Sequence, residues 1–434
     1  MPGVGDFEEY DFFTDSRFVA DPYPYFADLR DRSPVLREPH RDVVMITGYD
    51  EAVAVCHDPK TFSSCLSVTG PFPGFPVPLA EHADGDITDL IEKHRGELPM
   101  NDQLPTLDPP VHTDHRALLM RLITPKRLKE SEEHMWELAD RMLDPWLTGG
   151  QGEFIHGLAG PFTLLVIADL LGVPEEDQAE FREALQHRPA EHGVGGTDGR
   201  EMALNPLEFL YGRFTAYIDD RRANPRADVL TGLAQATFPD GSLPEVIDVV
   251  RIAANLFSAG QETTVRLLGA ALQVIGDRPD IQAELRADRS KIPNFIEECL
   301  RHESPVKGDF RLSRVPTTVG GVDLPAGTTV MVVNGAANRD PRRFPEPDVF
   351  DLNRENARHH MSFGRGIHTC PGAPLARAEA RAMLERLLDR TTDIRISEKV
   401  HGPAGARRYQ YIPTFILRGV THLALEFDRV ESTV

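Results

Sequence analysis

The stretch Phe363-Gly364-Arg365-Gly366-Ile367-His368-Thr369-Cys370-Pro371-Gly372 decides the fold of this chain. Glycines surround its single cysteine, so the backbone can turn tightly around the sulfur and approach a flat group closely. We expect Pro371 to begin a helix, whose N-terminal dipole and free N–H groups favour a thiolate over a thiol. A lone cysteine is more often a buried inert thiol. This spacing instead predicts that Cys370 is an anionic axial ligand.

A second motif, Ala259-Gly260-Gln261-Glu262-Thr263-Thr264, lies in the longest helix that the hydrophobic spacing predicts, residues 244–275. Two small residues leave room beside the helix for a planar group and a diatomic ligand. Thr263 comes four residues after Ala259, so its hydroxyl can reach that carbonyl and open the helix locally. We expect a groove, the Thr263 hydroxyl and the Glu262 carboxyl to converge. In isolation the motif would indicate only a packing seam.

Two further motifs pair charged side chains along helices. His112 and Arg116, in the segment Asp108-Pro109-Pro110-Val111-His112-Thr113-Asp114-His115-Arg116, are four residues apart and can bind an anion together. Glu298 and Arg301 are three apart and can form an ion pair, which on a surface would stabilise the fold by only about 0–1 kcal/mol. Neither motif would indicate function alone.

These motifs resemble those of the cytochrome P450 superfamily, the haem-thiolate monooxygenases, and they follow the family order over nearly the whole chain. The family signature F-x-x-G-x-[HR]-x-C-x-G is met at Phe363, Gly366, His368, Cys370 and Gly372. The chain is similar to soluble bacterial members. The resemblance implies haem b (iron protoporphyrin IX) with the Cys370 thiolate on its iron. It implies that the cofactor-binding residues are His112, Arg116, Ala259, Gly260, Arg311, Phe363, Gly364, His368, Cys370 and Gly372.

The resemblance also assigns roles to the charged and hydroxyl residues. Glu262 and Thr263 would deliver protons during oxygen activation, and Glu298 with Arg301 would be a buried structural pair. The usual third member of that pair is an Arg in P-x-R-F, but Pro347-Asp348-Val349-Phe350 has valine at that place. Arg354 is the candidate substitute.

Composition and periodicity indicate a mainly α fold with small β-sheets. The chain has 434 residues, of which 41% are hydrophobic and 26% charged, typical of a globular protein. Helical spacing dominates between Pro110 and about Arg390, and strand-like segments return at Thr317–Val322 and Thr328–Val333. The resemblance implies the P450 fold, a single triangular helical domain over residues 1–434 that encloses haem and has no fused reductase.

Residues 70–107 are rich in Gly and Pro and show no period. Long ordered loops in compact proteins are usually functional, so we interpret this segment as a candidate substrate lid. By resemblance, the substrate pocket would include Phe257, Ser258, Val306, Lys307, Phe310, Phe415 and Ile416. Most of these are apolar, which fits a hydrophobic small molecule. Lys307 could contact a substrate carboxylate, although a stem that reaches solvent is the favoured interpretation.

Charge excludes some partners. Lys+Arg 47 against Asp+Glu 68 gives a net charge of −21, which opposes binding to nucleic acid. The longest apolar-rich stretch, Phe162 to Val173, contains Asp169 and is shorter than the ~20 residues of a membrane helix. The N-terminus is acidic, unlike a secretory leader. Cys56, Cys65, Cys299 and Cys370 form no C-x-x-C pair. We therefore expect a cytoplasmic monomer without a membrane anchor.

The function that these features predict is insertion of one oxygen atom from O2 into a hydrophobic small molecule, which is thereby hydroxylated. A separate acidic ferredoxin and its reductase would supply the electrons. Alternatives are a peroxide-driven haem peroxygenase and a non-catalytic haem sensor or carrier, and the Glu262-Thr263 pair favours the monooxygenase. The basic residues Arg121, Lys126, Arg127, Lys129, Arg365 and Arg377 would form a docking patch for ferredoxin, unless they pair with acids such as Glu130, Glu132 and Glu379.

Overall fold

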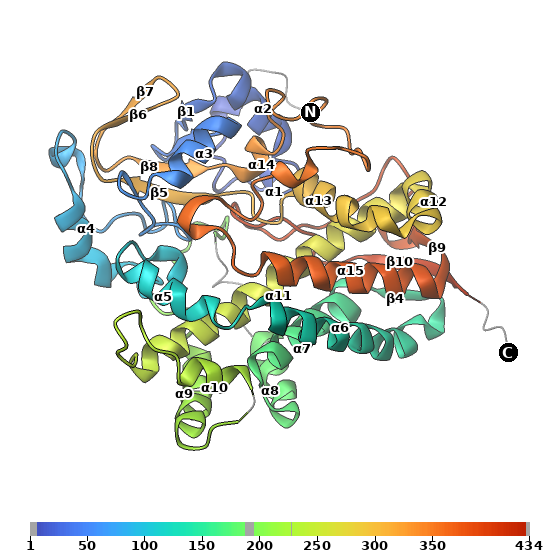
Figure 1. Ribbon diagram of the computed structural model, residues 1–434. Helices are drawn as coiled ribbons and strands as arrows, with labels where there is room; N and C mark the ends of the chain where they lie inside the picture. The colour runs from blue at the N-terminus through green and yellow to red at the C-terminus, as the bar shows by residue number, and fades with distance from the viewer. Residues whose placement is uncertain (1–6, 187–194, 227, 431–434) are drawn as a thin grey trace.

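Helices dominate the computed structural model, which describes residues 7–186, 195–226 and 228–430 (Figure 1). The longer helices are α2 (Tyr23–Arg32), α3 (Tyr49–His57), α5 (Val111–Met120), α6 (Pro125–Trp146), α7 (Gly160–Leu171), α8 (Glu175–Gln186), α9 (Glu208–Ala223), α11 (Val246–Asp277), α12 (Pro279–Ala287), α13 (Ile292–Glu303) and α15 (Ala373–Arg390). The shorter ones are α1 (Arg17–Ala20), α4 (Thr88–His94), α10 (Val229–Ala234), α14 (Asn334–Ala337) and α16 (Glu398–His401). The helix predicted over residues 244–275 is confirmed as α11, whose bounds lie two residues later at each end.

The long helix α11 is the centre of the main hydrophobic core. It packs against α7 and α9 on one side and against α13 and α15 on the other, while α6 lies along α15 (Figure 1). Side chains on several faces of α11 are buried, among them Phe257, Leu268 and Leu272. A helix that is apolar on several faces belongs inside a protein, so α11 is held on all sides and provides a rigid wall.

Small sheets complete the described part of the chain. One has the order β1 (Val35–Arg37), β2 (Val44–Ile46), β8 (Thr329–Val332), β5 (Asp309–Ser313), β3 (Phe62–Ser63), and in it only β2 and β8 run parallel. A second has the order β4 (Gln151–Glu153), β10 (Ala424–Arg429), β9 (Thr391–Ile396). The third is the hairpin of β6 (Thr317–Val319) and β7 (Val322–Leu324).

The hairpin corrects one predicted strand. Thr317–Val322 was expected to be continuous, but the chain reverses at Gly320 and Gly321, whose φ angles are +56° and +81°. Two consecutive residues with positive φ favour a tight hairpin turn, which glycine adopts without steric cost. The glycine pair in the sequence was the signal for this turn.

The segment 70–107 is also more ordered than predicted. It contains α4 and short 3-10 turns at Ala80–His82, Arg95–Glu97 and Leu104–Thr106. Long-range bonds hold it, among them Ile87 N–H to the Arg314 carbonyl at 2.8 Å. Its helical turns are too short to give a periodic sequence signal, which explains why none was found. Among the described residues, no helix is both long enough and apolar enough to span a membrane.

Candidate active site

The loop before α15 presents Cys370 as the glycine pattern predicts, with one change. The Cys370 N–H donates to the Phe363 carbonyl at 2.8 Å, which closes the loop around the sulfur. Gly364 and Gly366 have φ angles of +66° and +68°, and a Cβ on Gly366 would lie 2.0 Å from the Cys56 carbonyl oxygen. Gly372, in contrast, has an ordinary helical φ of −80°. These two earlier glycines are therefore the ones that the loop requires.

The start of α15 corrects the predicted helix boundary. The helix begins at Ala373, with Pro374 in its first turn, rather than at Pro371. Burial raises the pKa of the Cys370 thiol, while the backbone N–H groups of Gly372 and Ala373 and the charge of Arg116 act in the opposite direction. Burial outweighs these N–H groups, so in the protein alone the pKa of Cys370 is raised, and the predicted thiolate stays a prediction.

Two adjoining chambers of about 270 Å3 and 200 Å3 lie between this loop and α11. Residues that line both chambers come from α11, β5, the cysteine loop and α15: Thr263, Thr264, Asp309, Arg311, Phe363, His368, Cys370 and Ala376. Arg116, Ala259, Gly260 and Gly372 line the larger chamber, and Gly364 lines the smaller one. The structure thus brings nearly all of the predicted cofactor residues to one cavity.

Donor groups gather at one end of this cavity. His112, 2% exposed, lies beside His368 with ring centroids 4.1 Å apart, and its Nε2 has no hydrogen-bond partner in the described residues. Burial and the charge of Arg116 lower the pKa of His112 to about 4. Burial and Arg311 lower the pKa of His368 to about 2, and Ser64 Oγ lies 2.9 Å from its Nε2. Because burial and the neighbouring arginines disfavour a protonated imidazole here, these two histidines would become protonated only beside an anion.

Two arginines near these histidines bond to the cysteine loop and to strand β5. Arg116 Nη2 donates to the Thr369 carbonyl at 2.5 Å, and Arg311 Nη1 donates to Asp309 Oδ2 at 2.5 Å. Both guanidinium groups are at least half-buried and line the cavity. Arg116, Arg311, His368 and the Cys370 thiol line one cavity, and the unpartnered His112 Nε2 belongs to the ring beside His368. This donor set suits haem, with the sulfur for iron and the basic groups for its propionates.

The α11 motif only partly converges on the cavity. The Thr263 hydroxyl donates to the Ala259 carbonyl at 2.9 Å, as predicted, and Thr263 lines both chambers. The helix nevertheless remains uninterrupted through this bond. Glu262 does not face the cavity; it accepts a hydrogen bond from Arg266 at 3.0 Å and is 40% exposed. The expected meeting of hydroxyl and carboxyl is therefore not observed, because Arg266, four residues later, holds the carboxylate.

The pair Glu298 and Arg301 is buried and has the predicted third member. Arg301 donates from Nε and Nη2 to the two Glu298 oxygens, each at 2.7 Å, and both side chains are 0% exposed. Arg354 Nε donates to Glu298 Oε1 at 3.0 Å, which confirms it as the substitute. Both arginines also donate to carbonyls between Asn338 and Val349. The cluster fixes the long connection that precedes the cysteine loop.

Most of the predicted substrate-pocket residues lie away from the cavity. Only Val306 lines it. Phe257 packs against Phe181 and Phe214 in the main core, and Ser258, beside it on α11, is not a wall residue. Phe310, Phe415 and Ile416 belong to a separate aromatic cluster with Phe13 and Phe72. The aromatic residues fill the core beside the pocket because they pack against one another.

Lys307 corrects both interpretations of its side chain. It is 1% exposed, and Nζ donates to the Thr414 carbonyl at 2.7 Å rather than reaching solvent or the cavity. Burial and the charge of Arg418 lower the pKa of Lys307 well below its ordinary value. Its contact holds the segment that follows Tyr411 against β5.

Leu104 comes from the segment 70–107, which was expected to line the pocket, whereas the wall residues that sequence reasoning missed include Ser67, Val68, Leu119, Asn255, Leu256 and Leu375. Asn255 and Leu256 precede Ala259 by four and three residues on α11, so helical periodicity could have identified them. Asp108, in the predicted motif, accepts bonds from Ser63 Oγ and Ser64 N–H at 2.5 Å and 2.8 Å and pairs with Arg95 and Arg314. It ties the His368 contact to the lid segment.

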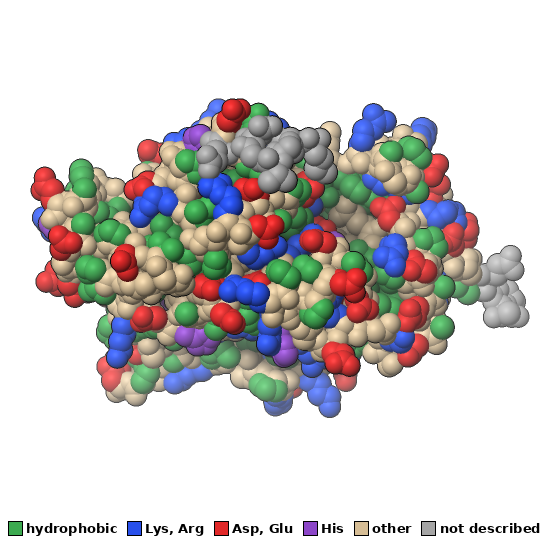
Figure 2. All heavy atoms as spheres, turned by 90° about the horizontal axis from the view of Figure 1, so that it is seen from above, with side chains coloured by type: hydrophobic (Ala, Val, Ile, Leu, Met, Phe, Trp, Pro, Cys, Tyr) green, Lys and Arg blue, Asp and Glu red, His purple; other side chains and the backbone are tan. Residues whose placement is uncertain are grey.

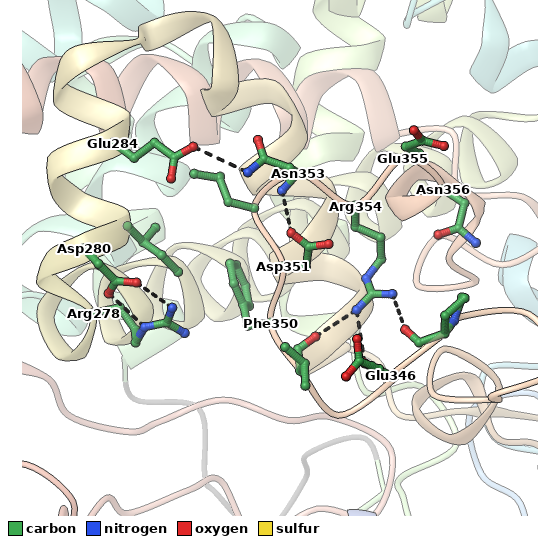
Figure 3. A pocket seen from close by; sticks show the side chains of 14 residues that line it. Arg278, Asp280, Glu284, Glu346, Phe350, Asp351, Asn353, Arg354, Glu355 and Asn356 are labelled. Carbon is green, nitrogen blue, oxygen red and sulfur yellow. Dashed lines mark hydrogen bonds and ion pairs between the residues drawn. The ribbon is translucent and has the colours of Figure 1, made fainter.

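A larger hollow of about 640 Å3 lies elsewhere, between α12 and residues 345–356 (Figure 3). Its side chains bond mainly to neighbours, as Arg278 does to Asp280 at 2.7 Å and Arg354 does to the Pro345 carbonyl at 2.7 Å. No residue of the cysteine loop lines it. The smaller chambers at Cys370 are therefore the candidate active site.

Comparison with known proteins identifies the family. A family profile described as "Cytochrome P450" matches residues 218–392. The chain is 33% identical over 418 residues to the cytochrome P450 monooxygenase PikC of Streptomyces venezuelae, covering 95% of this chain and 92% of that protein. It is 32% identical over 424 residues to the 6-deoxyerythronolide B hydroxylase of Saccharopolyspora erythraea, covering 95% and 97%.

A solved structure agrees along nearly the whole chain. The Mycobacterium marinum cytochrome P450 CYP150A6, in its substrate-free form, is 56% identical with a TM-score of 0.90, over 98% of this chain and 100% of that one. The predicted mainly α fold with small sheets is thereby confirmed as the P450 fold. The chain is a cytochrome P450 monooxygenase, an oxidoreductase of the bacterial cytochrome P450 family.

Proposed function

We propose that this monooxygenase hydroxylates a hydrophobic small molecule with O2, using haem b and electrons from a separate ferredoxin and its reductase. The observation that carries the proposal is the single cavity lined by both Cys370 and Thr263. A thiol that can bind iron and a hydroxyl therefore border the same space, which oxygen chemistry at a thiolate-bound haem requires. We further propose that the chain acts as one haem domain, a cytoplasmic monomer without nucleic-acid or membrane partners.

The chain's residues divide the work between binding and proton transfer. Haem, when bound, supplies the activation of dioxygen. Cys370 would give its thiolate to the iron, and His112, Arg116, Arg311 and His368 would hold the propionates. Ala259, Gly260, Phe363, Gly364 and Gly372 shape the walls against the ring. Because its own proton bonds to the Ala259 carbonyl, Thr263 offers its oxygen to the cavity as an acceptor that orients a proton donor there.

The cavity walls support the substrate class. Val68, Leu104, Leu119 and Leu256 are apolar and line the larger chamber, and Ser67 and Asn255 add a few polar groups to it. A mostly apolar cavity with few polar groups selects hydrophobic ligands and orients them. The substrate is therefore a hydrophobic small molecule that presents one or two polar atoms.

A peroxide-driven peroxygenase is the second candidate function. The ion pair of Glu262 with Arg266 favours it, since that carboxylate is held away from the cavity where proton delivery to oxygen would be needed. The two functions differ in their oxidant. Product formation is therefore compared with O2 plus ferredoxin, reductase and nicotinamide reductant, and with hydrogen peroxide alone, after a library screen for optical shifts finds a substrate.

The monooxygenase proposal expects product with the electron-transfer proteins and little product with peroxide. The reverse ratio would establish the peroxygenase, and binding without product under either condition would leave a haem sensor or carrier. Cys370→Ala is the negative control in both assays, because loss of the sulfur ligand removes either activity.

The surface around the cysteine loop supports ferredoxin docking with a revised set of residues. Arg121 and Lys129 are exposed, whereas Lys126 Nζ lies 3.8 Å from Glu130 Oε1, as the pairing alternative expects. Among the described residues Arg365 bonds to carbonyls and a hydroxyl, so no acid cancels its charge. Arg377 instead pairs with Glu297 at 2.6 Å. The face seen in Figure 2 mixes acidic and basic side chains, so the net charge of −21 is dispersed rather than gathered there.

Charge reversal tests this surface. Lys129→Glu with Arg365→Glu should slow haem reduction by ferredoxin about tenfold at low salt and reduce its dependence on ionic strength. Lys399→Glu, an exposed lysine on α16, is the matched control and should leave the rate unchanged. An equal rate in both variants would show that ferredoxin docks elsewhere.

A further inference from the structure

A charged cluster lies beside the cysteine loop, and its three members are not among the wall residues of either chamber. Glu297, on α13, is 1% exposed and accepts hydrogen bonds from Arg377 Nε at 2.6 Å and from Arg377 Nη2 at 2.9 Å. The buried His360 ring has its Nε2 3.1 Å from Glu297 Oε2. The Glu297 carboxylate therefore joins α13, α15 and the segment that leads into the cysteine loop.

The hydrogen bonds fix the charge states in this cluster. The Ser362 N–H donates to His360 Nδ1 at 3.1 Å, so Nε2 carries the ring proton and donates to Glu297. Burial lowers the pKa of His360, which keeps the ring neutral. Burial would raise the pKa of Glu297, but the bonds from His360 and Arg377 lower it to about 2. Glu297 is therefore a carboxylate, and in the described residues Arg377 is the cation that neutralises it.

Arg377 also covers the aromatic ring of the loop. Its guanidinium carbon lies 4.6 Å from the centre of the Phe363 ring, within the range of a cation–π contact. The same ring lines both chambers, and the Phe363 carbonyl accepts the Cys370 N–H bond that closes the loop. The guanidinium thus contacts the residue that both walls the cavity and closes the loop around the sulfur.

The ion pair presents its positive member to the loop, since the guanidinium rather than the carboxylate covers Phe363. Burial raises the pKa of the Cys370 thiol, whereas the charges of Arg116 and Arg377 both act to lower it. Arg116 contacts the other end of the loop, where its Nη2 donates to the Thr369 carbonyl. Two guanidinium groups therefore lie at the two ends of the loop. Charged groups around a metal ligand tune the potential of the metal that it binds.

We propose that Arg377 is a positioning residue whose charge stabilises negative charge on the Cys370 sulfur and thereby raises the reduction potential of the haem. Glu297 holds the guanidinium over Phe363, where this charge acts. The inference rests on the proposed function, because it concerns the haem that Cys370 would bind. One-electron reduction by ferredoxin adds one negative charge to the iron–thiolate unit, while no bond forms or breaks and no proton moves. A fixed positive charge beside the loop favours this reduced form.

The decisive variant removes both charges of the pair at once. Glu297→Gln with Arg377→Met leaves the net charge of the protein unchanged, keeps an acceptor for His360 and keeps an unbranched stem over Phe363. The equilibrium constant for one-electron reduction of the haem, measured by spectroelectrochemical titration, should fall about fivefold, which corresponds to ~41 mV. An unchanged potential would overturn the proposal, because the pair would then support the loop only as a neutral contact.

A single substitution separates the charge from its position. Arg377→Lys keeps the positive charge, but an ammonium group cannot form two parallel bonds to Glu297 or lie flat on Phe363. Its potential should therefore fall between those of the wild type and the double variant. A wild-type potential in Arg377→Lys would show that any cation at this place suffices, which would contradict the positioning by Glu297.

The C–O stretching band of the reduced carbon monoxide complex is the companion readout. Loss of the positive charge leaves more electron density on the sulfur, and this density passes through the iron to carbon monoxide. The band should move to lower wavenumber in the double variant, while the red-shifted absorption of thiolate ligation remains. A complex that instead loses this absorption would show that the pair only supports the fold, and the proposal would be overturned.

Glu132→Gln with Arg381→Met is the matched control. Arg381 comes four residues after Arg377 on α15, pairs with Glu132 of α6 and lies 5.8 Å over the Trp136 ring. Its double variant should leave the haem potential and the C–O band unchanged. Equal shifts in both double variants would mean that any lost pair on α15 has this effect, which would overturn the role of Arg377.

These measurements need no turnover, so the two levels of inference fail separately. A wild-type protein that binds no haem through a thiolate would contradict the proposed function. A thiolate-bound haem whose potential is the same in the wild type and in the Glu297→Gln, Arg377→Met variant would contradict only the role of Arg377.

Discussion

The cysteine loop, residues 363–372, and the lid segment, residues 70–107, border the same cavity but are held in opposite ways. The loop is fixed chiefly by its own backbone, since the Cys370 N–H bonds to the Phe363 carbonyl and two glycines adopt positive φ. Arg116 adds a bond to the Thr369 carbonyl. The lid is fixed by distant partners. Asp102 pairs with Arg251 of α11 at 2.7 Å, and Gln103 Nε2 donates to the Tyr211 hydroxyl of α9 at 2.8 Å.

This difference indicates that the cysteine loop keeps one conformation, whereas residues 70–107 can move. A thiolate ligand needs one geometry, and short-range constraints provide it whatever the rest of the surface does. We expect residues 70–107 to open more readily than the loop, because some of their tertiary contacts are partly exposed side-chain bonds that can be released at modest cost. Changes in the loop should therefore abolish function, whereas changes in the lid should alter access.

The largest effect is expected from Cys370→His. An imidazole can still hold some haem but lacks the anionic sulfur, so the red-shifted absorption of the reduced carbon monoxide complex should disappear. Cys299→Ala, which removes a buried cysteine on α13, should keep that band. A wild-type spectrum in Cys370→His would exclude Cys370 as the ligand.

Loss of the support behind the loop should come next. Glu298→Ala leaves Arg301 and Arg354 buried without their carboxylate, which should lower the free energy of unfolding by about 3–5 kcal/mol. Urea denaturation measures the change. Asp280→Ala breaks the exposed pair with Arg278 and should cost less than ~1 kcal/mol. Similar losses in the two variants would mean that the buried cluster has no special role.

Thr263→Ala tests the α11 wall of the cavity that the cysteine loop and residues 70–107 border. Removal of the hydroxyl should leave reductant consumption near the wild-type rate while hydrogen peroxide rises and product falls about tenfold, because the donor that Thr263 orients is lost. Product and peroxide are measured per electron consumed. Thr163→Ala, at a buried α7 position whose hydroxyl bonds to the Gly160 carbonyl, is the control and should keep the wild-type ratio.

The smallest effect is expected at the lid. Asp102→Asn removes the charge that pairs with Arg251, and a partly buried pair of this kind contributes about 1 kcal/mol. Association and dissociation of an azole ligand, followed by stopped-flow absorbance, should both become about fivefold faster, with Kd nearly unchanged. Asp428→Asn, at the exposed pair with Arg395, should not alter either rate. Unchanged exchange in Asp102→Asn would show that this contact does not restrain the lid.

Sequence motifs predicted the cysteine loop and the helices well because their constraints are local. Gly366 needs a positive φ and closeness to Cys56, and Thr263 reaches Ala259 within one helical turn. The substitution of Arg354 for the missing family arginine was also within reach of the sequence, since Arg354 comes only a few residues after the segment where the family has its arginine. Each of these depends on spacing of a few residues.

Predictions that depended on side-chain direction were wrong. Lys307 is buried against Thr414, and Glu262 bonds to Arg266 rather than facing the cavity. Phe310 and Phe415 pack with Phe13 instead of lining the pocket. In each case the partner comes from packing or from a competing charge that the family motif does not include.

The sequence by itself determined the family, the candidate ligand cysteine and the order of the helices, because glycine conformation, helical period and motif spacing are properties of adjacent residues. Only the tertiary structure decided which side chains line the cavity and how residues 70–107 are tied to α9 and α11. These contacts join segments far apart in the chain, so no local pattern in the sequence determines them.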